Sequence, residues 1–190
     1  HTSYIHTSAA QIHPQFDTTI EAILRADSFG YVVFPTGSHP HLAEQLMERF
    51  QHTIKDAAIL SRIQFIPPNG NFLQREMFMQ LIRLATVVLD PVPFGGGLTS
   101  LEAFKVGTPV VTRNNTHRSG RLTLAMYELM GLQRHQWGIH QNFTCCTANS
   151  ESEYVHMALV LAGAIKGNAG VRQEVMDAIA RRRGILFNDR

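Results

Sequence analysis

Short runs of β-branched and aromatic residues alternate along this chain with longer stretches whose apolar residues recur at helical spacing. The short runs predict strands at 3–6, 31–34, 62–66, 86–89 and 109–112, with a weaker one at 142–145. The longer stretches predict helices near 15–26, 40–57, 71–84, 98–106, 118–130, 151–165 and 170–183. The chain therefore reads as a series of alternating strands and helices.

The predicted strands at 31–34 and 86–89 are apolar almost throughout. Such strands are typical of a parallel sheet that helices cover on both faces, because neither face meets water. Strand-helix-strand crossovers are right-handed. The sequence therefore predicts an α/β fold, a doubly wound Rossmann-like parallel sheet of about six strands with helices on both faces, in which ligands bind beyond the carboxyl ends of the strands.

Composition limits both the number of domains and the class of partner. A length of 190 residues suffices for one domain and is too short for two, so we expect residues 1–190 to form a single domain. The 17 Lys and Arg against 15 Asp and Glu give a net charge of +2, which disfavours a nucleic-acid partner. No apolar run approaches the roughly 18 residues of a membrane-spanning helix, so no membrane partner is expected.

The two cysteines, Cys145 and Cys146, are adjacent in the sequence. We expect them to be badly placed to bridge each other or to build a zinc site. This favours a reducing compartment, and hence a cytoplasmic or nuclear protein. Because the chain begins at His1 without a methionine, we expect it to be a fragment of a longer, two-domain enzyme.

The most informative segment runs from Leu89 to Thr112 and reads strand, loop, helix, turn, strand. The three glycines at 95–97 remove every side chain where the loop meets the helix, so a ligand can approach the backbone. The amides of Leu98, Thr99 and Ser100 lie at the helix start, where they lack partners within the helix. With the helix dipole and a hydroxyl from Thr99 or Ser100, they suit a diphosphate.

Glu102, one turn further along, can accept hydrogen bonds from both hydroxyls of a ribose. From these residues alone a second interpretation stays open, in which the glycines form a flexible loop and Glu102 is solvated or favours the helix dipole. Neither usual nucleotide fingerprint is present, since no Gly-x-Gly-x-x-Gly follows the first strand and no Gly-Lys-Ser/Thr ends a loop. No Asp-x-Asp pair occurs either, so we expect a diphosphate site without a metal.

The segment from Leu89 to Thr112 resembles the nucleotide-sugar segment in the carboxyl-terminal domain of GT-B glycosyltransferases. Those proteins end the segment in a Gly-Thr-Pro-Val-Val turn and strand like Gly107 to Val111. Within that superfamily, the chain is most similar to the O-linked N-acetylglucosamine transferase family over nearly its whole length. Retaining GT-B enzymes commonly carry a second glutamate eight positions before the one matched by Glu102. Phe94 stands there instead, which favours the inverting type.

The resemblance implies a domain that binds UDP-GlcNAc for inverting transfer of GlcNAc to a protein Ser or Thr hydroxyl, without a cofactor or metal. An amino-terminal catalytic domain would hold the protein acceptor, so the isolated chain should bind the donor and be inactive in transfer. Thr99 would meet the diphosphate and Glu102 the ribose. Together with the residue-level argument, the predicted donor site comprises Gln11, Gly96, Gly97, Leu98, Thr99, Ser100, Glu102, His117 and Arg118, of which the last two follow the strand at 109–112.

Three positions depart from the family pattern. Gln11 stands where the family has a lysine that stabilises the leaving diphosphate, and Phe78 stands where it has a histidine. Gly97 begins a Gly-Leu-Thr sequence where the family has His-Thr-Thr. Gln11 and Arg121 are the catalytic candidates that remain. Two alternatives stay open, a degenerate nucleotide-binding or assembly module and a GT-B enzyme that uses another sugar nucleotide.

Overall fold

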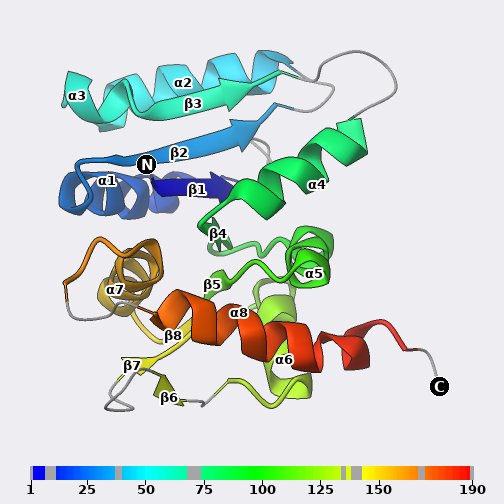
Figure 1. Cartoon of the computed structure of the whole chain (residues 1–190). Coiled ribbons are helices and arrows are strands. Elements are labelled where there is room, and N and C mark those ends of the chain that lie inside the picture. The colour runs from blue at the N-terminus through cyan, green and yellow to red at the C-terminus, as the bar shows by residue number, and fades with distance from the viewer. Residues whose placement is uncertain are drawn as a thin grey trace.

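The computed structural model describes residues 2–6, 12–36, 40–67, 74–133, 136–137, 143–166 and 170–188. Its centre is a six-stranded sheet in the order β3-β2-β1-β4-β5-β8, in which every neighbouring pair is parallel. Figure 1 shows the strands running through the middle of the molecule. They are β1 (Thr2–His6), β2 (Gly30–Pro35), β3 (Ile63–Ile66), β4 (Val87–Leu89), β5 (Val110–Arg113) and β8 (Thr147–Ala148).

Helices cover both faces of this sheet. On one face α1 packs against α2, α3 and α7, and on the other α4 packs against α5, which packs against α6 (Figure 1). The final helix, α8, contacts α5 and α7. The helices are α1 (Asp17–Ala26), α2 (Pro40–Thr53), α3 (Ala57–Leu60), α4 (Gln74–Leu84), α5 (Gly97–Val106), α6 (Leu122–Leu129), α7 (Glu151–Ala162) and α8 (Val171–Arg182), with 3₁₀ turns η2 (Pro14–Phe16), η3 (Arg118–Gly120) and η4 (Arg183–Leu186).

The predicted doubly wound fold is confirmed, and the first five predicted strands are all in the sheet. The sixth is placed differently. Phe143–Thr144 forms β7, which pairs antiparallel with β6 (Gln136–Trp137) in a separate two-stranded ribbon. The strand that extends the sheet is β8, whose register places Thr147 beside Thr112. Two-residue strands are too short to carry an alternating pattern, so the sequence could not separate β7 from β8.

At the carboxyl ends of four helices in the described part of the chain, main-chain carbonyls accept hydrogen bonds from an arginine of a distant element. Arg62 reaches the end of α1, Arg172 the end of α4, Arg183 the end of α5 and Arg182 the end of α6. The last carbonyls of a helix have no partner within it. A guanidinium satisfies them and places a positive charge at the negative end of the helix dipole.

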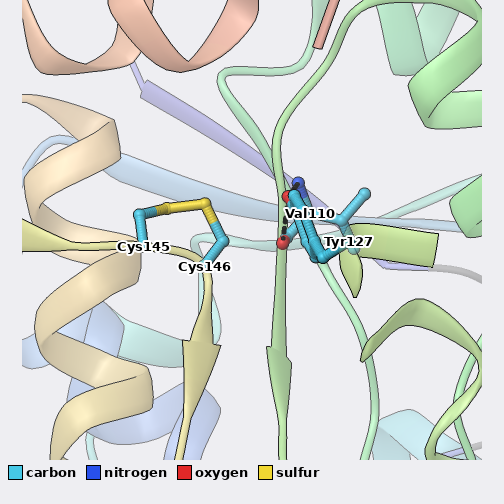
Figure 2. Close-up of a disulfide and its surroundings, with 4 residues drawn as sticks. All are labelled: Val110, Tyr127, Cys145 and Cys146. Carbon is cyan, nitrogen blue, oxygen red and sulfur yellow. Dashed lines mark hydrogen bonds between the residues drawn. A yellow bond between two sulfur atoms is a disulfide. The ribbon is translucent and has the colours of Figure 1, made fainter. Parts of the chain in front are cut away.

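The adjacent cysteines form a disulfide, which corrects the expectation that they cannot bridge. The peptide bond between Cys145 and Cys146 is cis and their Cα atoms are 3.1 Å apart, closer than the roughly 3.8 Å of a trans peptide. Both side chains are buried, and Figure 2 shows the bridge where the chain leads into β8. The Cys146 carbonyl accepts a hydrogen bond from the Thr112 amide in β5. The two cysteines therefore no longer favour a reducing compartment.

Candidate nucleotide-binding site

The order of the sheet reverses between β1 and β4. From β1 the chain builds outward through β2 to β3, and β4 then starts the other half on the opposite side of β1. In doubly wound sheets, ligands bind beyond the carboxyl ends of the strands at this switch point. Because β4 ends at Leu89, the segment at 90–97 lies at the switch point. Gln11, predicted for the turn after β1, falls outside the described residues.

The bend formed by the glycines at 95–97, called the glycine bend below, is held by a buried carboxylate. Asp90 is 1% exposed, and its Oδ1 accepts a hydrogen bond from the Gly96 amide at 2.5 Å. Its Oδ2 accepts another from the Thr112 hydroxyl at 2.7 Å. Burial raises the pKa of Asp90, while these hydrogen bonds oppose the shift by favouring the ionised form. The bend is thus tied to both β4 and β5.

The segment after β5, residues 114–121, packs directly on the outer side of the bend. The Asn115 side-chain amide donates to the Pro93 carbonyl at 2.7 Å. A Cβ atom on Gly120 would collide with the same carbonyl, so only glycine permits this approach. The structure therefore brings the loops after β4 and β5 together, as expected for ligand-binding residues at this edge of the sheet.

The start of α5 offers fewer open amides than the sequence suggested. The Thr99 and Ser100 amides both donate to the Gly96 carbonyl, at 2.6 and 3.3 Å. The Ser100 hydroxyl is fully buried and shares a hydrogen bond of 2.7 Å with the Thr123 hydroxyl of α6. Its role is therefore in packing α5 against α6. The groups that remain at the helix start for a ligand include the Gly97 and Leu98 amides and the half-buried Thr99 side chain.

Glu102 lies inward rather than toward bulk solvent. It is only 8% exposed, and its Oε1 lies 3.6 Å from Nε of Arg75 on the neighbouring helix α4. The Arg75 side chain is 74% exposed. One turn into the helix that the bend begins, a nearly buried acid thus lies beside an exposed base.

Two predicted arginines line a hollow next to the bend. Arg118 and Arg121 border a cavity of about 420 Å³ together with Thr116, Leu122 and Ala125. Cavities of roughly 300–1,000 Å³ hold small-molecule ligands. A Cβ on Gly97 would lie 3.1 Å from Leu122 Cδ1, so the hollow adjoins the bend. The third predicted residue of this segment, His117, is exposed at the start of η3, and its amide donates to the Asn115 side chain.

The remaining sequence-based expectations concern Phe78, a metal site and a membrane-spanning helix. Phe78, which stands in place of the family's histidine, is half-buried and packs against the main hydrophobic core. Among the described residues, no three His, Cys, Asp or Glu side chains gather closely enough to hold a metal ion. No helix in the described part of the chain could cross a membrane.

Sequence reasoning missed Asp90, Thr112 and Thr123. One signal could have found the first of them, because Asp90 follows the apolar run of β4 directly, at the carboxyl end of a strand where this fold binds ligands. The two threonines carry no such signal. Their importance comes from neighbours that lie more than twenty residues away along the chain.

No family model matches the chain, and no curated protein matches it in sequence. Solved structures do match in fold. A mutant O-GlcNAc transferase from Thermobaculum terrenum matches with a TM-score of 0.76 at 22% identity, over 99% of this chain and 33% of that one. The C-terminal domain of a glycosyl transferase group 1 family protein from Francisella tularensis matches with a TM-score of 0.59 at 13% identity, over 95% and 85%.

A UDP-GlcNAc 2-epimerase from Neisseria meningitidis, bound to UDP-GlcNAc, matches with a TM-score of 0.51 at 12% identity, over 99% of this chain and 44% of that one. The chain thus has the Rossmann-like fold of GT-B glycosyltransferases, and the proteins that share it include an O-GlcNAc transferase. The resemblance predicted from the sequence is confirmed at this level. The chain spans about 33% of the length of that transferase.

Proposed function

We propose that this chain is the donor-binding domain of an inverting GT-B glycosyltransferase, with UDP-GlcNAc as the donor and a protein Ser or Thr hydroxyl as the acceptor. The observation that carries the proposal is the place of the glycine bend, at the switch point of the sheet and one helical turn before the buried Glu102. The fold shared with an O-GlcNAc transferase supports it. So does the fold shared with an epimerase that binds UDP-GlcNAc.

The diphosphate and the ribose of the donor each have groups to meet them. The Leu98 amide and the Thr99 hydroxyl, at the positive end of the α5 dipole, bind the diphosphate. Glu102 accepts hydrogen bonds from the ribose hydroxyls, since its contact with Arg75 is too long to use its acceptor capacity. Arg118 and Arg121, in the adjoining hollow, supply positive charge to the diphosphate.

In the transfer step the acceptor hydroxyl attacks the anomeric carbon of the sugar while the bond from that carbon to the β-phosphate oxygen breaks. The proton of the acceptor hydroxyl passes to water, and UDP leaves with the bonding electron pair. Negative charge grows on the diphosphate, and one well-placed donor there lowers the barrier by about 2–4 kcal/mol. Arg121 is the candidate in the described residues for this role, and Gln11 is the other. No cofactor or metal enters this scheme.

An amino-terminal domain beyond this chain would hold the acceptor. The isolated domain is therefore expected to bind UDP without transferring sugar to a peptide. Isothermal titration with UDP, GDP and ADP tests the binding and the base preference. We expect micromolar affinity for UDP and weaker binding of the other two. Transfer from UDP-GlcNAc to a peptide by this chain alone would show that the catalytic groups are placed wrongly.

A second candidate is a degenerate module that uses the same fold for assembly or sensing. Gly97 and Phe78 favour it, because the first lacks the family's imidazole and the second packs into the core. The same titration decides between the two. Absence of UDP binding up to millimolar concentration supports the degenerate module. Tighter binding of GDP or ADP than of UDP supports an enzyme for another sugar nucleotide.

A further inference from the structure

Asp90 is a buried carboxylate whose partners lie on several separate elements. Oδ1 accepts from the Gly96 amide of the bend at 2.5 Å, and Oδ2 accepts from the Thr112 hydroxyl of β5 at 2.7 Å. The Asp90 main-chain carbonyl accepts from the Tyr154 hydroxyl of α7 at 3.0 Å. Buried charged groups are retained where their hydrogen bonds are satisfied. Asp90 thus joins the bend to strand β5 and to helix α7.

The connection continues into the helices that flank the site. The Thr123 hydroxyl of α6 shares a hydrogen bond of 2.7 Å with the Ser100 hydroxyl of α5, and Thr123 opposes the rise in the pKa of Asp90. Ser100 and Thr123 are both fully buried. Asp90 therefore ties the bend to β5 and α7, and the buried Ser100–Thr123 pair ties α5 to α6.

The bend has no space to relax toward this carboxylate. A Cβ atom on Gly95 would lie 3.2 Å from Asp90 Oδ2 and 3.3 Å from the Ser119 carbonyl. The glycine thus lies close to both the carboxylate and the loop after β5. Such packing keeps the helix start in one conformation.

We propose that Asp90 is a positioning residue that holds the bend in its ligand-binding form before the nucleotide arrives. The inference rests on the proposed function. A ligand that binds an ordered loop does not have to supply the free energy of ordering it, so a preformed bend raises affinity. Asp90 touches no ligand in this scheme and acts only through the Gly96 amide and the start of α5.

The test compares UDP affinity with unfolding free energy in three variants, all titrated well below their unfolding midpoints. Asp90→Asn is expected to weaken UDP binding about ten- to a hundredfold. Thr112→Val, which removes one partner at nearly constant shape, is expected to weaken it about threefold. The control is Tyr127→Phe. Its hydroxyl is buried and bonded to the Val110 backbone in β5 (Figure 2), so the variant loses stability while its UDP affinity stays unchanged.

Hydrogen exchange of the Gly96 amide gives a readout that needs no variant. The amide is expected to be protected in the free protein, because Asp90 already holds it. Fast exchange that slows only when UDP is added overturns the inference. So does unchanged UDP affinity in both Asp90→Asn and Thr112→Val. If the unmodified chain does not bind UDP at all, the proposed function fails and the inference fails with it, a result distinct from the other two.

Discussion

The Glu102 carboxylate lies 3.6 Å from Nε of Arg75, so a nearly buried acid of α5 faces an exposed base of α4. This distance exceeds the roughly 2.7–3.2 Å of a hydrogen bond. Arg75 can therefore balance the charge of Glu102 without occupying its oxygen atoms. The pair leaves a desolvated acceptor at the place where the proposed ribose would bind.

The first prediction separates ribose contacts from phosphate contacts. Glu102→Ala is expected to weaken the binding of UDP and of uridine alike, by about ten- to a hundredfold, because charged hydrogen bonds contribute about 1.5–3 kcal/mol each. Thr99→Ala is expected to weaken UDP binding while leaving uridine binding unchanged. Titration calorimetry measures both ligands.

Arg75→Gln provides the control for stability. Its ion pair is mostly exposed on the arginine side, so the free energy of unfolding should change by less than about 1 kcal/mol. Uridine affinity that is unchanged in Glu102→Ala would remove the ribose role from Glu102.

The second prediction concerns the contact between the loops after β4 and β5. In Gly120→Ala, the new Cβ would collide with the Pro93 carbonyl and lie 2.5 Å from Asn115 Nδ2. We expect the free energy of unfolding to fall by about 1–3 kcal/mol in urea denaturation, as overpacked sites do. The matched variant is Gly184→Ala, where the nearest atom is 3.9 Å away and no loss is expected. Equal stability of the two variants would contradict the close contact.

The third prediction follows from the raised pKa of Asp90. Burial raises this pKa above its usual value of 3.8, so the native state holds the proton more tightly than the unfolded chain does. Between 3.8 and the raised pKa, the free energy of unfolding therefore falls as the pH increases. The advantage in stability of the natural protein over Asp90→Asn should shrink as the pH rises from about 4 toward neutrality. Urea unfolding of both proteins across that range measures the difference in free energy of unfolding. A difference that grows with pH would contradict a raised pKa of Asp90.

The fourth prediction tests the arginines at the helix ends. Arg62 donates to the Leu24 and Asp27 carbonyls, each at 2.6 Å, at the end of α1. Arg62→Met should lower the free energy of unfolding by about 1–3 kcal/mol, because it removes both of these charge-assisted hydrogen bonds. Arg25→Met on the same helix removes a side chain that is 58% exposed, and should change it by less than about 0.5 kcal/mol. Similar values for the two would mean that the capping bonds contribute nothing.

The strands and the glycine bend could be predicted because burial on both faces leaves a continuous apolar run. β2 and β4 are such runs, and the position of the bend directly after β4 makes it a ligand-binding candidate from the sequence alone. The pairing of β8 with β5 could not be predicted, since two residues carry no periodicity.

The buried hydrogen bonds of the site could not be predicted, because they join residues that lie far apart in the sequence. Asp90 and Thr112 are separated by 22 residues, and Ser100 and Thr123 by 23. Each is an ordinary polar residue when considered alone. The Cys145–Cys146 disulfide is similar, because it forms across a cis peptide bond, and adjacency in the sequence gives no indication of that geometry.

Binding of a nucleoside diphosphate at the start of α5 can be followed residue by residue in an amide NMR titration of the ¹⁵N-labelled chain with UDP. We expect the Gly96, Gly97, Leu98 and Thr99 amides to shift first and to saturate together with that of Glu102. The amides of α3, far along the sheet beside β3, should stay unchanged and serve as the internal control. Saturable shifts confined to other elements, or none up to millimolar UDP, would contradict it.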